Sequence, residues 1–77
     1  MVKGQASLDF TPQKVKEIRK KLNMSQGEFA KIFRIPVSSL RNWEQGKRKM
    51  DATSAAYLRT ISLFPEEARI AQITDVT

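Results

Sequence analysis

Residues 25–49 read SQGEFAKIFRIPVSSLRNWEQGKRK, and this stretch predicts two short helices joined by a tight turn. Ser25 and Glu28 have the spacing of a capping box, so the first helix is expected to begin at Gln26. The apolar side chains of that helix fall on one face, at Phe29, Ala30 and Phe33. Because so short a helix is not stable alone in water, this face must pack against other helices.

Pro36 marks the start of the second helix. A proline disfavours a helical conformation for the residue before it and suits the first turn of a new helix, so Arg34 and Ile35 are expected to form the turn. The second helix is expected over residues 36–45, and Gly46 ends it. Its inward side chains are predicted to be Ser39, Leu40 and Trp43, and its outward side chains Val37, Ser38, Arg41 and Asn42.

The rest of the chain predicts more helices and no convincing strand. Further helices, each begun by a capping residue or a proline, are expected at residues 12–22, 52–63 and 65–71. We therefore expect an all-α fold, a compact bundle of four to five helices. One domain, residues 11–71, is predicted between a flexible N-terminal arm of residues 1–10 and a C-terminal tail of residues 72–77.

The composition argues against enzymes and metal sites. The 77 residues include no cysteine and no histidine, which removes the usual zinc ligands and the commonest general base. Ser38 and Ser39 have no base to activate them as nucleophiles, so neither catalysis nor a cofactor is expected. No apolar run approaches the roughly 20 residues of a membrane span, and nothing resembles a signal peptide, so a cytoplasmic protein without membrane contact is predicted.

The charge is distributed unevenly along the chain. Residues 1–50 carry twelve lysines and arginines against four acids, a net charge of +8, whereas residues 51–77 carry a net charge of −2. Such an asymmetry favours a polyanion as one partner and a different contact surface in the second part of the chain. A basic run at residues 47–49 follows the second helix directly, and it is expected to contact phosphate groups.

Two helices with a short turn between them form a helix-turn-helix, in which the second helix enters the major groove of DNA. The outward residues suit this task, because asparagine pairs with adenine, arginine pairs with guanine and valine contacts the thymine methyl group. The sequence from Gln26 to Gly46, and above all VSSLRNWEQG at residues 37–46, resembles the phage-repressor/Cro-like superfamily, also called the XRE family. The match to its lambda-repressor-like fold extends over residues 12–63. Within that superfamily, LRNWEQGKRK followed by a helix and Phe64-Pro65-Glu66 is similar to the HigA-type antitoxins of bacterial toxin–antitoxin operons.

The resemblance implies a role for several side chains. The residues that it places on base edges are Val37, Ser38, Arg41 and Asn42. The residues that it places on DNA phosphates are Gln26, which is also a candidate for an outer base edge, Lys47 and Arg48. It further implies an internal ion pair between Arg19 and Glu44. Pro36 departs from the family pattern, because it stands where a serine or threonine usually caps the second helix.

We expect the protein to act as a homodimer on palindromic double-stranded DNA, since one monomer offers too few base contacts for useful specificity. The predicted dimer contacts are Leu63, Phe64, Ile70 and Ile73. The first hypothesis is a repressor that is also the antitoxin of a ribonuclease toxin, which it binds through the N-terminal arm or the acidic tail. A stand-alone regulator of the phage or restriction-controller kind is the second hypothesis. The third hypothesis is a coactivator-like module that bridges proteins or binds RNA. A toxin gene adjacent to this one on the chromosome would favour the first hypothesis.

Overall fold

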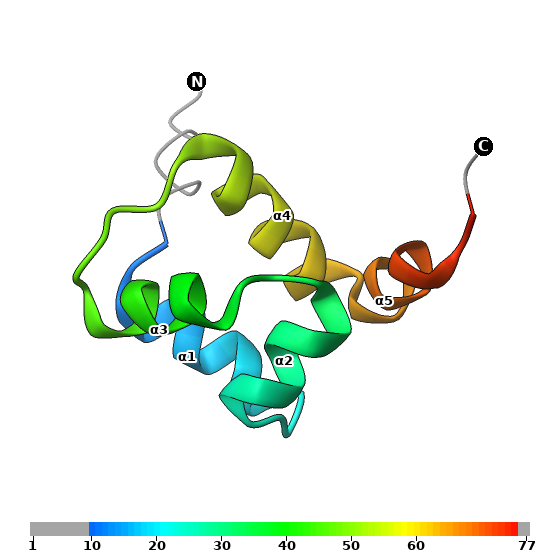
Figure 1. The fold of residues 1–77 in the computed structure, drawn as a ribbon, viewed down its shortest axis with the longest axis horizontal. Helices are drawn as coiled ribbons and strands as arrows, with labels where there is room; N and C mark the ends of the chain where they lie inside the picture. Colours follow the sequence, from blue (N-terminus) through cyan, green and yellow to red (C-terminus); the bar gives the residue numbers. More distant parts are fainter. Residues whose placement is uncertain (1–9, 76–77) are drawn as a thin grey trace.

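The computed structural model describes residues 10–75, and within this range the chain forms five helices and no strand (Figure 1). The helices are α1 (Pro12–Lys21), α2 (Gln26–Phe33), α3 (Val37–Gln45), α4 (Ala52–Leu63) and α5 (Pro65–Ile73). The expected all-α fold is confirmed. Apart from Phe10, which is half-buried against the core, the predicted N-terminal arm lies outside the described residues, as does the end of the predicted tail.

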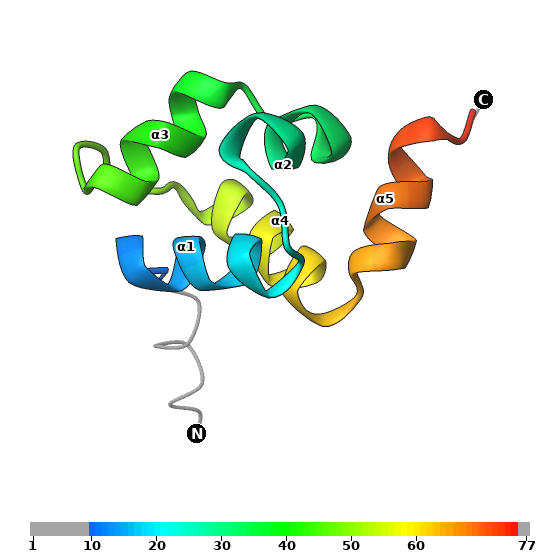
Figure 2. The ribbon, with the colours of Figure 1, turned by 90° about the horizontal axis from the view of Figure 1, so that it is seen from below.

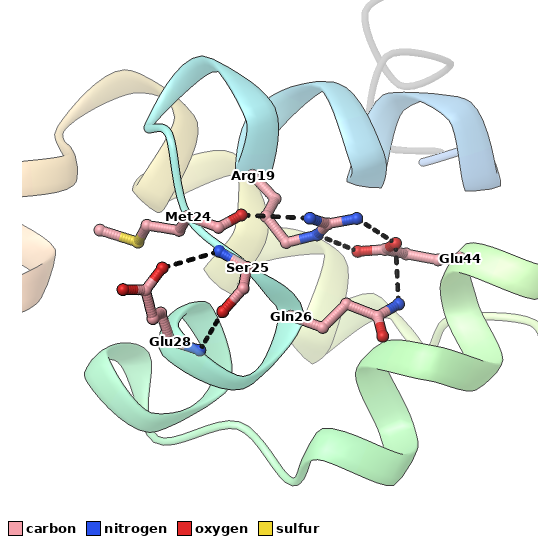
Figure 3. Close-up of polar contacts among 6 residues, drawn as sticks. All are labelled: Arg19, Met24, Ser25, Gln26, Glu28 and Glu44. Carbon is pink, nitrogen blue, oxygen red and sulfur yellow. Dashed lines mark hydrogen bonds and ion pairs between the residues drawn. The ribbon is translucent and has the colours of Figure 1, made fainter.

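Side chains of the residues before three of the helices cap their first turns. Thr11 and Asp51 each accept a hydrogen bond from the backbone N–H three residues further on, at the starts of α1 and α4. At the start of α2 the capping box is complete: Ser25 Oγ accepts from the Glu28 N–H at 3.1 Å, and Glu28 Oε1 accepts from the Ser25 N–H at 2.9 Å (Figure 3). These bonds satisfy amide groups that a helix start leaves unpaired.

Three helix ends differ by one or two residues from the expectation. Helix α1 stops at Lys21, and Asn23 then adopts the left-handed conformation, with φ 62°. Helix α3 starts at Val37, because Pro36 has an extended ψ of 127°. Helix α5 was expected to end at Ala71 and continues to Ile73, where Thr74 Oγ1 donates to the Ile70 carbonyl and satisfies a group of the last turn.

The helices surround one apolar core. The side chains in it that are almost completely buried are Val15, Phe29, Phe33, Leu40, Leu58 and Ile61. In Figure 2 helices α2 and α3 lie on one side and α1 on the other, and α1 and α3 contact each other directly. In both views the loop between α3 and α4 and helix α5 lie at opposite ends of the molecule (Figures 1 and 2). The basic run and the predicted dimer contacts are therefore far apart.

Candidate nucleic-acid interface

Helix α3 has one buried side and one side open to solvent. Leu40 is fully buried and Trp43 retains 9% of its exposure, so the prediction that Trp43 belongs to the core is confirmed. Of the predicted base-reading residues, Ser38 and Arg41 are exposed. The other two, Val37 and Asn42, are half-buried, and Val37 also packs against the edge of the core. The helix therefore presents two exposed and two half-buried side chains of this set.

The two ends of α3 have different local structures. Pro36 makes no side-chain hydrogen bond to the first turn, as its departure from the family pattern led us to expect. At the other end Gly46 adopts the left-handed conformation with φ 72°, which a residue with a Cβ atom adopts only with strain. The chain then turns sharply into the basic run. Its side chains Lys47, Arg48 and Lys49 are all exposed and extend the positive charge beyond the helix end.

The predicted ion pair between Arg19 and Glu44 is present and has two parallel bonds (Figure 3). Arg19 Nε donates to Glu44 Oε2 at 2.8 Å, and Arg19 Nη2 donates to Glu44 Oε1 at 2.8 Å. The Arg19 side chain is only 15% exposed and the Glu44 side chain only 2% exposed. This geometry joins the last turn of α1 to the end of α3, and the planar guanidinium of Arg19 matches the two carboxylate oxygens.

Two further hydrogen bonds extend this pair into a network. Arg19 Nη1 donates to the Met24 carbonyl at 3.1 Å, and Gln26 Nε2 donates to Glu44 Oε1 at 3.0 Å (Figure 3). Glu44 thus connects α1, the start of α2 and the end of α3. Sequence reasoning missed both bonds, because no spacing along the chain indicates that Gln26 reaches a residue eighteen positions later. The predicted phosphate contact of Gln26 would use the parts of its amide that this bond leaves available.

The network controls the ionisation of Glu44. Burial raises the pKa of the Glu44 carboxyl and is the largest single effect. The hydrogen bonds from Arg19 and Gln26, together with the positive charges of Arg19 and Lys16, outweigh it and place that pKa below its ordinary value of 4.5. The bond to Glu44 in turn raises the pKa of Arg19. Both groups are therefore charged at neutral pH, and the carboxylate can accept all three donors.

A comparison with protein families identifies the fold. A profile described as helix-turn-helix matches residues 15–56, which include α2, α3 and the basic run. The chain belongs to the helix-turn-helix family. The resemblance to the XRE type is thereby confirmed, and DNA-binding transcriptional regulation is the class of function that this family supports.

A similarity to one curated protein supports the narrower resemblance. Over 65 residues the chain is 31% identical to antitoxin HigA-2 of Vibrio cholerae serotype O1. The alignment covers 84% of this chain and 62% of that protein, so this helix-turn-helix chain spans less than two thirds of its relative. Among residues 10–75 no helix is long and apolar enough to cross a membrane, and no cluster of three or more acidic side chains suits a metal ion.

Proposed function

We propose that this protein is a dimeric, sequence-specific repressor that binds a palindromic operator and neutralises a ribonuclease toxin encoded in the same operon. The observation that carries the proposal is the exposed side of α3. It combines the guanidinium of Arg41, the amide of Asn42 and the hydroxyl of Ser38 with the methyl groups of Val37. These groups differ in hydrogen-bonding character, as reading of the major groove requires.

The basic run supports the placement of α3 in the major groove. Lys47 and Arg48 are exposed, they directly follow α3, and they lie on the chain segment that leaves its C-terminal end. Positive side chains beside a groove-reading helix bind phosphates regardless of base sequence, and so set the position of the helix. A stand-alone regulator would have the same interface, and the gene adjacent to this one on the chromosome distinguishes the two hypotheses.

The dimer is proposed to form through an apolar surface on the last two helices. The large apolar side chains of the described residues that are exposed are Leu63, Phe64, Ile70 and Ile73, which we call the α4–α5 apolar surface. These are also the residues predicted from the sequence as dimer contacts. Large exposed apolar side chains favour association, and a two-fold dimer buries the same surface on both copies. That symmetry matches the two half-sites of a palindrome.

Replacing Ile73 by lysine is expected to separate the dimer. Ile73 is 69% exposed, so the change removes little packing within one chain, whereas a dimer would have to bury the new charge. We expect sedimentation to show monomers at concentrations where the natural chain is dimeric, and affinity for the full palindrome to fall by at least about tenfold. The matched control is Ala56→Lys, which adds the same charge at an exposed position of α4 outside this surface. A dimer that persists in Ile73→Lys would contradict the assignment, and so would a dimer that Ala56→Lys disrupts to the same extent.

Toxin neutralisation is proposed to depend on the N-terminal arm. HigA-2 of Vibrio cholerae is named an antitoxin, and the arm ends at Phe10, which packs against the core. Removal of residues 1–9, which keeps Phe10 in place, is expected to abolish protection of cells that express the neighbouring toxin gene. Operator binding should remain, because the helices and the basic run are unchanged. If the shortened chain still protects the cells, the acidic tail becomes the neutralising segment.

A further inference from the structure

Tyr57 makes a polar contact between α4 and the end of α2. Its hydroxyl donates to the Phe33 carbonyl oxygen at 2.6 Å. Phe33 is the last residue of α2, where carbonyl groups have no partner within the helix. Its ring is buried and packs against the ring of Phe29 with centroids 4.9 Å apart. Phe33 is thus held through both its side chain and its backbone.

The residue held in this way leads directly into the turn of the helix-turn-helix. Three residues separate Phe33 from the first residue of α3, and Arg34 among them has a left-handed φ of 56°. The start of α3 has no side-chain cap of its own, because Pro36 occupies that position. The other end of α3 is anchored by Glu44. Besides the packing of Val37 against the core, the direction of the first turn of α3 therefore depends on the chain that precedes it.

Tyr57 also lies next to α5, the helix that carries Ile70 and Ile73 of the α4–α5 apolar surface. Its side chain is half-buried, and its hydroxyl also has a hydrogen bond with the Gln72 side chain of α5. Burial raises the pKa of Tyr57, and the hydrogen bond with Gln72 acts in the opposite direction. The phenol consequently stands between α5 and the turn before α3.

We propose that Tyr57 is a positioning residue for DNA binding, which sets the direction in which the N-terminal end of α3 enters the major groove. This inference rests on the proposed function. The nine residues of α3 span about 13 Å. With the far end anchored, a looser turn displaces the near end, which carries Val37 and Ser38, more than the second turn, which carries Arg41 and Asn42.

The test is the Tyr57→Phe variant, which keeps the ring and removes the hydroxyl. We expect the dissociation constant for the operator to rise about fivefold, the usual effect of one lost hydrogen bond. Binding-site selection should show the loss of preference at the base pairs next to Val37 and Ser38, with those next to Arg41 and Asn42 retained. In the free protein, changes in backbone amide chemical shifts should concentrate at residues 34–38.

A matched control separates positioning from general stability. Thr60 on α4 also donates its hydroxyl to a backbone carbonyl, that of Ala56 at 3.0 Å, but within the same helix. Thr60→Val should leave operator affinity and base preference unchanged. The inference is overturned if Tyr57→Phe binds like the natural chain, or if it weakens all base positions equally in step with a lower melting temperature. A natural chain without any base preference would overturn the proposed function itself, and this inference with it.

Discussion

The Glu44→Ala variant is expected to lose about 3 kcal/mol of its free energy of unfolding, the usual effect of removing one partner from a buried ion pair. The Glu44 side chain is only 2% exposed and accepts three hydrogen bonds, two from Arg19 and one from Gln26. Without Glu44, the Arg19 guanidinium remains largely buried and loses the negative charge that it pairs with. Because small domains are stable by only about 5–15 kcal/mol, this loss should be evident in urea unfolding at 25 °C.

Glu17→Ala is the matched control for this change. Glu17 is an exposed glutamate on α1, and its side chain accepts one long hydrogen bond from Gln13. Its replacement should change the free energy of unfolding by no more than about 0.5 kcal/mol. A Glu44→Ala variant that is no less stable than Glu17→Ala would show that desolvation cancels the whole attraction within the network.

The same carboxylate should make the stability depend on pH. The pKa of Glu44 is lower in the folded chain than its ordinary value of 4.5, so the unfolded chain binds a proton more readily. The stabilisation from ionised Glu44 is therefore complete above that ordinary value and declines as the pH falls through the lower, folded value. Glu44→Ala should lack this component of the acid response.

The second large effect is expected from Arg41→Ala and Asn42→Ala, measured by selection of bound sequences from random DNA. Each variant should lose discrimination at particular base pairs of each half-site, by about 1–3 kcal/mol for a lost pair of hydrogen bonds to a base. Arg41 is exposed and Asn42 half-buried on α3, so neither change should unfold the domain. If both variants select the same sequence as the natural chain, α3 is not the recognition helix.

Lys47→Ala provides the contrast, because it removes a positive charge from the basic run and no group from α3. Lys47 is exposed and is predicted to contact phosphate, so its loss should weaken binding to all sequences alike. The slope of the logarithm of affinity against the logarithm of salt concentration should become shallower by about one unit. Unchanged salt dependence, or a change confined to one base pair, would contradict a phosphate contact.

The pattern of capping residues, prolines and apolar spacing was enough to predict five helices. These signals are local, so Ser25, Pro12 and Gly46 act on the backbone within one helical turn of their own positions. The least accurate boundary was the end of α5. No glycine or proline stops the helix there, and a hydrogen bond from Thr74 extends it.

The candidate interface was only partly predictable in the same way. The sequence identified the outward side of α3 and, through the family resemblance, the Arg19–Glu44 pair. It did not indicate the bond from Gln26 to Glu44 or the bond from Tyr57 to Phe33. These contacts join residues 18 and 24 positions apart, and they depend on how the helices pack rather than on any local preference.

The sequence by itself thus determined the helices and the buried sides of α2 and α3, because helical periodicity and capping are properties of short segments. Only the tertiary structure decided how both ends of α3 are held. Glu44 anchors one end through side chains from α1 and α2, and Tyr57 on α4 holds the chain that enters the other. Such contacts exist only when separate helices are packed around a common core, since each requires atoms from distant parts of the chain to lie within about 3 Å.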